Sequence, residues 1–184
     1  MKYKVAQTES KSTKCALSET MIDVLIQQIQ HELYNHNLYK TFANFFNVEG
    51  LVKLGTYYDA RAKEELLHHQ WIVDYLNANN VAFSYPSVPE ISEVFDEYIE
   101  PFELTLYKEI ETTKAISEIV DLAYSEQDWL TFNWLMSGSG AKLVAEQIEE
   151  ESISRTVLNI ANQDDSWISK EAAIVDAYNR ENNI

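Results

Sequence analysis

The 184-residue chain has few of the residues that interrupt helices or cross-link chains: four glycines, three prolines and a single cysteine, Cys15. One cysteine excludes an intrachain disulfide and is typical of a protein in a reducing compartment. No apolar run approaches the roughly 20 residues of a membrane-spanning helix. The first fifteen residues are polar and lack the apolar segment of a secretory signal peptide. We therefore expect a cytoplasmic protein without a membrane partner.

Positive charge is also scarce. The chain has 14 Lys and Arg against 30 Asp and Glu, a formal net charge of −16 at pH 7. It contains no basic stripe that would neutralise phosphates, which argues against nucleic acid as a partner. The excess of acidic residues favours a surface or cavity that attracts cations.

Long helices are the expected outcome of this composition, since 46% of the residues are hydrophobic and helix breakers are rare. Ser18 is a suitable N-cap for the first helix. The helical period predicts helices over residues 18–47, 51–77, 101–125, 128–162 and 167–179. Residues 77–92 have no sustained helical period and are long enough to cross the full height of a bundle.

These elements predict an all-α fold: a four-helix bundle of two antiparallel hairpins joined by a long crossover loop, plus a short C-terminal fifth helix. The length fits one domain. We expect residues 18–184 to form that domain and residues 1–17 to form a flexible N-terminal extension.

Each of the four long helices carries a polar side chain in the middle of an apolar stripe. These positions are held by Glu32, Glu65, Glu109 and the pair Gln147 and Glu150. A carboxylate that leaves water without a partner loses several kcal/mol, so four such helices need a shared cation. His68 follows Glu65 by one turn, on the same helix face, where both side chains reach one ion. Hard oxygen ligands with one imidazole suit Fe(II).

This pattern resembles the bacterial non-haem ferritins across roughly residues 18–162. The segments that carry the resemblance are IQHELYNHNLY (29–39), KEELLHHQ (63–70), WIVDYL (71–76), YKEIE (107–111), EQDWLTFNWL (126–135) and AEQIEEE (145–151). Many ferritin-like di-iron proteins have a second Glu-x-x-His motif, whereas this chain has Gln-x-x-Glu at 147–150, as these ferritins do. The resemblance implies a ferritin-like fold and a ferroxidase that oxidises Fe(II) with dioxygen or hydrogen peroxide. It also implies a shell of 24 identical subunits that stores the ferric mineral.

The resemblance further implies a dinuclear iron centre. The first iron would be held by Glu32, Glu65 and His68. Glu65 would bridge to a second iron that is held by Glu109 and Glu150, with Gln147 adjacent. No haem is expected.

A third iron site and a redox-active tyrosine are also implied by the resemblance. Glu64, Glu146 and Glu149 would form the third site and share Glu150 with the dinuclear centre. Tyr39 matches a tyrosine that lies beside that centre and can donate an electron during oxidation. For the remaining histidines we expect surface or capping roles; these are His31, His36 and His69.

The fourth helix is longer than the pattern requires. Glu32 and Glu65 are 33 residues apart, whereas Glu109 and Gln147 are 38 apart, and the sequence MSGSG occupies residues 136–140. Five extra residues in a continuous helix add about 500° of rotation, or about 140° beyond a full turn. That rotation would turn Gln147 away from the core. We therefore expect a bulge or break at residues 137–140, and the sequence leaves open whether a working centre survives it.

Two other functions stay open at this level. One is a di-iron redox enzyme of the rubrerythrin or oxygenase kind, although such enzymes normally have a second Glu-x-x-His, and rubrerythrins add a four-cysteine iron site. The other is a helical interaction module whose metal site has degenerated.

Overall fold

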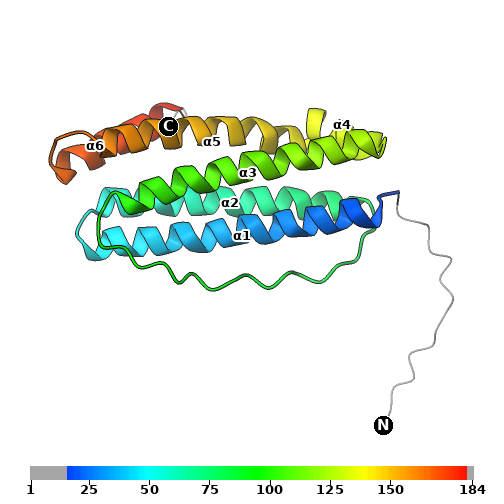
Figure 1. Cartoon of the computed structure of the whole chain (residues 1–184), viewed down its shortest axis with the longest axis horizontal. Coiled ribbons are helices and arrows are strands. Elements are labelled where there is room, and N and C mark those ends of the chain that lie inside the picture. Colours follow the sequence, from blue (N-terminus) through cyan, green and yellow to red (C-terminus); the bar gives the residue numbers. More distant parts are fainter. Residues whose placement is uncertain (1–15, 182–184) are drawn as a thin grey trace, which may run out of the picture.

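The computed structural model describes residues 16–181, and within this range the chain forms six helices and no strand (Figure 1). The helices are α1 (Glu19–Val48), α2 (Val52–Ala78), α3 (Glu100–Ser125), α4 (Trp129–Ser137), α5 (Ser139–Ala161) and α6 (Trp167–Glu181). The all-α bundle predicted from the sequence is confirmed. Most of the extension predicted for residues 1–17 lies outside the described residues. None of the described helices combines the length and apolarity needed to cross a bilayer.

The helices pair as two hairpins. Helices α1 and α2 lie side by side and are joined by a short turn in which Gly50 has a φ of 79°. This left-handed conformation favours glycine. The second hairpin consists of α3 and the α4–α5 pair, and α6 folds back against α5 (Figure 1).

The connection between α2 and α3 runs along the length of the bundle, so these two helices point in the same direction (Figure 1). It contains residues 79–92 of the predicted non-helical stretch 77–92 and extends to residue 99, so α3 begins one residue before the predicted start at residue 101. Two ring contacts and two hydrogen bonds hold the last part of this connection. The rings of Phe95 and Tyr98 each pack 5.8 Å from Phe45. The Glu100 carboxylate accepts hydrogen bonds from the backbone N–H groups of Asp96 and Glu97, at 2.8 and 2.9 Å. These bonds fix the non-helical residues just before α3.

The predicted fourth helix is divided at Gly138. Helix α4 begins after Asp128, whose Oδ1 accepts from the Thr131 N–H at 3.0 Å. It ends at Ser137; Gly138, with a ψ of −149°, separates it from α5, which starts at Ser139. Gln147 and Glu150 are buried behind this break. The five additional residues therefore do not turn them away from the core.

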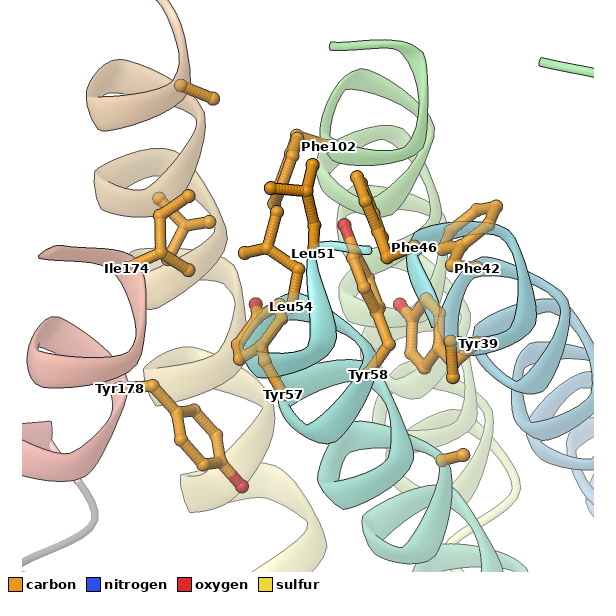
Figure 2. Close-up of a cluster of buried hydrophobic side chains, with 14 of the residues drawn as sticks. Tyr39, Phe42, Phe46, Leu51, Leu54, Tyr57, Tyr58, Phe102, Ile174 and Tyr178 are labelled. Atoms are coloured by element: carbon orange, nitrogen blue, oxygen red, sulfur yellow. The ribbon is translucent and has the colours of Figure 1, made fainter. Parts of the chain in front are cut away.

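The hydrophobic core has two clusters, one toward each end of the bundle. The first is rich in aromatic side chains from α1, α2, α3 and α6 and includes Phe46, Tyr58 and Phe102 (Figure 2). In it, Tyr178 of α6 meets Tyr57 of α2 with ring centroids 5.2 Å apart. The second cluster is mainly aliphatic and runs from Leu17 and Met21 to Leu143. The buried polar side chains of the candidate site lie between the two clusters.

Candidate metal centre

The polar positions predicted from the apolar stripes converge in the bundle interior. Helix α1 contributes Glu32, α2 contributes Glu65 and His68, α3 contributes Glu109, and α5 contributes Gln147 and Glu150; all six are buried. Helix periodicity explains the convergence, since residues three or four apart lie on one face. Each of the four helices turns its polar position toward the same point on the bundle axis.

Two groups of these side chains are close enough to share an ion. The first is Glu32, Glu65 and His68, and the second is Glu65, Glu109 and Glu150; within each group the ligand atoms lie within 4.8 Å of one another. Nδ1 of His68 is 3.6 Å from Glu65 Oε2 and 4.0 Å from Glu32 Oε2. Ligands bonded to one ion at about 2.0–2.2 Å are separated by about 4 Å or less. Small side-chain movements would bring each group to bonding distance, and Glu65 belongs to both.

Several polar atoms of the six converging side chains have no hydrogen-bond partner among residues 16–181. They are Glu32 Oε2, Glu65 Oε1, His68 Nδ1, Gln147 Oε1 and Glu150 Oε2. Buried polar atoms in folded proteins are nearly always paired. A cluster of unpaired acceptors around one point is the arrangement that a cation would satisfy.

The electrostatics of the site also favour a cation. Burial raises the pKa of Glu32 well above its usual value, and the neighbouring Glu65 raises it further. Burial raises the pKa of Glu65 to about 7 and that of Glu150 to about 8. Burial alone would lower the pKa of His68, but the surrounding carboxylates, Glu150 foremost, raise it well above its usual value. Without a metal, bound protons offset the charge of the centre.

Neighbouring side chains orient the carboxylates. Gln28, one turn before Glu32, donates from Nε2 to Glu32 Oε1 at 2.6 Å. Gln147 donates from Nε2 to Glu109 Oε2 at 2.8 Å. The Tyr39 hydroxyl, fully buried, donates to Glu109 Oε1. Tyr39 therefore lies beside the centre, where the resemblance placed it, and contacts one of the candidate ligands directly.

Arg61, like Gln28, contacts the candidate ligands but was not predicted from the sequence. Arg61 lies one turn before Glu65, on the face of α2 that carries the ligands, and only 1% of the residue is exposed. Its guanidinium contacts Glu109 and Glu150 at 2.6 and 3.0 Å. In the sequence, the only indication was that Arg61 lies four residues before Glu65. Oppositely charged residues at this spacing usually form an ion pair on the helix surface.

The residues proposed for a third iron site are not brought together as a group. Glu64 contacts Arg61 at 3.3 Å and accepts from the Tyr178 hydroxyl at 2.6 Å. Glu146 Oε2 is 3.3 Å from His68 Nε2, and Glu149 is exposed. Within the described part of the chain, none of the three belongs to a group that could hold an ion.

The other histidines lie outside both ligand groups. His31 Nε2 contacts the Thr112 hydroxyl at 2.7 Å, and His36 Nδ1 contacts the Ala62 carbonyl at 2.7 Å. Burial lowers the pKa of His69, which lies next to the ligand His68 in the chain. His31 and His36 each have a hydrogen-bonding partner outside the two ligand groups.

Comparison with known proteins agrees with this architecture. The chain is similar to the bacterial non-heme ferritin of Staphylococcus saprophyticus, with 29% identity over 155 residues that cover 82% of this chain and 88% of the relative. The bacterial non-heme ferritin of Campylobacter jejuni is 29% identical over 143 residues, which cover 78% and 83%. Among solved structures, an open-pore ferritin from Archaeoglobus fulgidus has a TM-score of 0.78 at 27% identity and covers 87% of this chain and 98% of that one.

The model of one family covers most of the chain. It is described as Ferritin, a ferritin-like domain, and it matches residues 22–163, which include every candidate ligand named above. The chain belongs to the ferritin family.

Proposed function

We propose that this chain is the subunit of a cytoplasmic iron-storage shell that oxidises Fe(II) at the buried centre and stores the ferric product. The observation that carries the proposal is the convergence of buried carboxylate and imidazole groups from four helices on two adjoining positions, with several of their atoms unpaired within residues 16–181. Iron is the substrate in this scheme, and the stored mineral is the product.

The proposed site residues divide between two iron positions. Glu32, Glu65 and His68 bind the first Fe(II), and Glu65, Glu109 and Glu150 bind the second, with Gln147 orienting Glu109. Two bridged irons each give one electron to dioxygen, which with two protons yields hydrogen peroxide. Hydrogen peroxide serves as the alternative oxidant. The carboxylates stabilise Fe(III) through their negative charge.

The ligands of the site favour release of the ferric product over permanent binding of iron. It has one imidazole and a neutral amide among carboxylates, so the ferric product is held mainly by oxygen ligands. Glu64 contacts Arg61, Glu146 contacts the ligand His68, and Glu149 is exposed on α5. We propose that these three side chains form a third iron position only after they move toward one another, and that this position receives iron that leaves the centre.

Exposed apolar side chains support the assembly of many subunits. Leu67, Trp129, Leu130 and Ile148 are each more than half exposed. Large exposed apolar side chains are candidates for contacts between subunits, because contiguous exposed apolar patches mark interaction sites. A shell of 24 chains of 21.3 kDa has a mass of about 510 kDa.

The proposal is tested by adding Fe(II) aerobically to the assembled protein and following ferric absorbance. Size-exclusion chromatography then shows whether iron elutes with a particle of about 510 kDa. We expect fast oxidation and retained iron in the wild type and in Glu118→Ala, which alters an exposed α3 side chain. Glu65→Ala should oxidise iron no faster than buffer. Fast oxidation without retained iron would favour a di-iron redox enzyme instead, and no oxidation above buffer would favour an interaction module.

A further inference from the structure

Arg61 places a fixed positive charge inside the candidate centre. Within residues 16–181 it is the only buried Lys or Arg. Its Nη2 lies 2.6 Å from Glu109 Oε1 and its Nη1 lies 3.0 Å from Glu150 Oε1. These two carboxylates, with Glu65, are the second ligand group. The guanidinium therefore bridges the same two side chains that a second metal ion would bridge.

The two ligand groups differ in how many of their atoms are already paired. In the first group, Glu32 Oε2, Glu65 Oε1 and His68 Nδ1 have no hydrogen-bond partner in the described part of the chain. In the second group, Glu109 is paired at both oxygens: Oε1 accepts from Arg61 and Tyr39, and Oε2 accepts from Gln147. Glu150 Oε1 also accepts from Arg61, and only Glu150 Oε2 and the shared Glu65 Oε1 are unpaired there within residues 16–181. An ion that binds the first group therefore meets unpaired ligand atoms. An ion that binds the second group must replace the hydrogen bonds of Glu109.

Arg61 has a second set of contacts that leads away from the centre. Its Nη1 is also 3.3 Å from Glu64 Oε2, and the Glu64 side chain is 24% exposed. The guanidinium lies 5.7 Å from the centre of the Tyr39 ring, and its Nε has no partner within residues 16–181. Glu64 thus offers an ion pair that Arg61 can retain after it leaves Glu109 and Glu150.

We propose that Arg61 is a built-in counter-ion at the second metal position, so that the centre fills in a fixed order. The first divalent ion binds at Glu32, Glu65 and His68 while Arg61 neutralises Glu109 and Glu150. The second ion binds only after it displaces the guanidinium toward Glu64. This inference rests on the proposed function in one respect, namely that the buried carboxylates bind metal. It makes Arg61 the residue that sets the affinity of the second position.

Zinc titration of the assembled protein tests this order, because Zn²⁺ binds carboxylates and imidazole and has no redox chemistry. Calorimetry of the wild type should resolve two Zn²⁺ ions per chain, and the dissociation constant of the second should be at least about tenfold higher than that of the first. Arg61→Gln removes two charge-assisted hydrogen bonds with which the second ion competes, so the ratio of the two dissociation constants should fall by about 10-fold to 100-fold. Arg180→Gln, which removes the same charge from an exposed α6 position, should behave as the wild type.

A second measurement uses the unaltered protein and does not depend on the variant folding. Crystals soaked in increasing Zn²⁺ should show anomalous density first at Glu32, Glu65 and His68. Where density also appears between Glu109 and Glu150, Arg61 should have moved away from both carboxylates.

An unchanged ratio of the two constants in Arg61→Gln would overturn the proposal, and so would two zinc ions bound with the Arg61 ion pairs intact. Absence of zinc from both positions in the wild type would overturn the proposed function as well. The failure of the ordered filling and the failure of the metal centre are therefore distinguishable.

Discussion

The side chain of Trp134, in α4, lies directly against Gly140, in the first turn of α5. A Cβ atom at residue 140 would be 2.7 Å from Cδ2 of the indole and 2.9 Å from the Trp134 carbonyl oxygen. The indole also stacks on Tyr75 of α2 with centroids 4.2 Å apart, and its Nε1 donates to Ser139 Oγ at 3.0 Å. The break in the fourth helix is therefore packed against the bundle, and it requires a residue without a side chain at this point.

Gly140→Ala should destabilise the protein for this reason. The tryptophan has to shift against its packed neighbours, which typically lowers the free energy of unfolding by about 1–3 kcal/mol. Thermal unfolding measures the change. The control is Ser152→Ala, at an exposed position of the same helix, which should unfold near the wild-type temperature. Equal unfolding temperatures for Gly140→Ala and the wild type would show that the break is not tightly packed.

Gln28→Met should weaken binding of the first metal ion. The substitution keeps the size of the side chain but removes the hydrogen bond to Glu32 Oε1, and loss of such an orienting partner typically reduces metal affinity by about 10-fold to 100-fold. Zn²⁺ titration measures the first dissociation constant. Gln27→Met changes the exposed neighbour and should leave that constant unchanged. If both variants bind the first ion as tightly as the wild type, Gln28 does not orient a ligand.

Tyr39→Phe should separate metal binding from oxidation. The variant keeps the aromatic packing but loses the hydroxyl that donates to Glu109, so two ions should still bind. If Tyr39 donates an electron, the variant should oxidise Fe(II) more slowly in stopped-flow absorbance. Tyr107→Phe removes an exposed tyrosine hydroxyl that bonds to Glu111 on α3 and serves as control. If Tyr39→Phe oxidises Fe(II) at the wild-type rate, Tyr39 does not donate an electron during oxidation.

The stability of the metal-free protein should fall as pH rises from about 5 to about 8. The pKa of Glu65 is raised from 4.5 to about 7 and that of Glu150 to about 8. The folded state thus binds protons that the unfolded state has already released, and ΔG of unfolding decreases with pH across this interval. Since one pKa unit corresponds to about 1.4 kcal/mol, the decrease is on the order of a few kcal/mol.

Glu65→Gln should flatten this dependence, because the amide cannot ionise. Glu118→Gln, at an exposed site on α3, is the control for the loss of one negative charge from this acidic chain. Urea unfolding at several pH values measures the slopes. A slope in Glu65→Gln as steep as that in Glu118→Gln would contradict the assignment of the pH dependence to the buried centre.

The polar positions of the centre could be predicted because helix periodicity is local. Glu32, Glu65 and Glu109 each interrupt an apolar stripe on their own helix, and a bundle brings such stripes together. Arg61 could not be predicted in the same way. Its burial depends on Glu109 and Glu150, which are 48 and 89 residues away in the chain and lie on other helices. The start of α3 could be predicted to within one residue, but the contacts of Phe95 and Tyr98 with Phe45 on α1, which hold the end of the crossover loop, could not.

Anomalous scattering at the iron edge, from crystals soaked anaerobically in Fe(II), tests the central claim most directly. We expect a strong peak between Glu32, Glu65 and His68, and a second peak between Glu65, Glu109 and Glu150 at higher iron concentration. An interior without iron, with peaks only at exposed carboxylates, would contradict the proposal that these buried side chains form the iron centre.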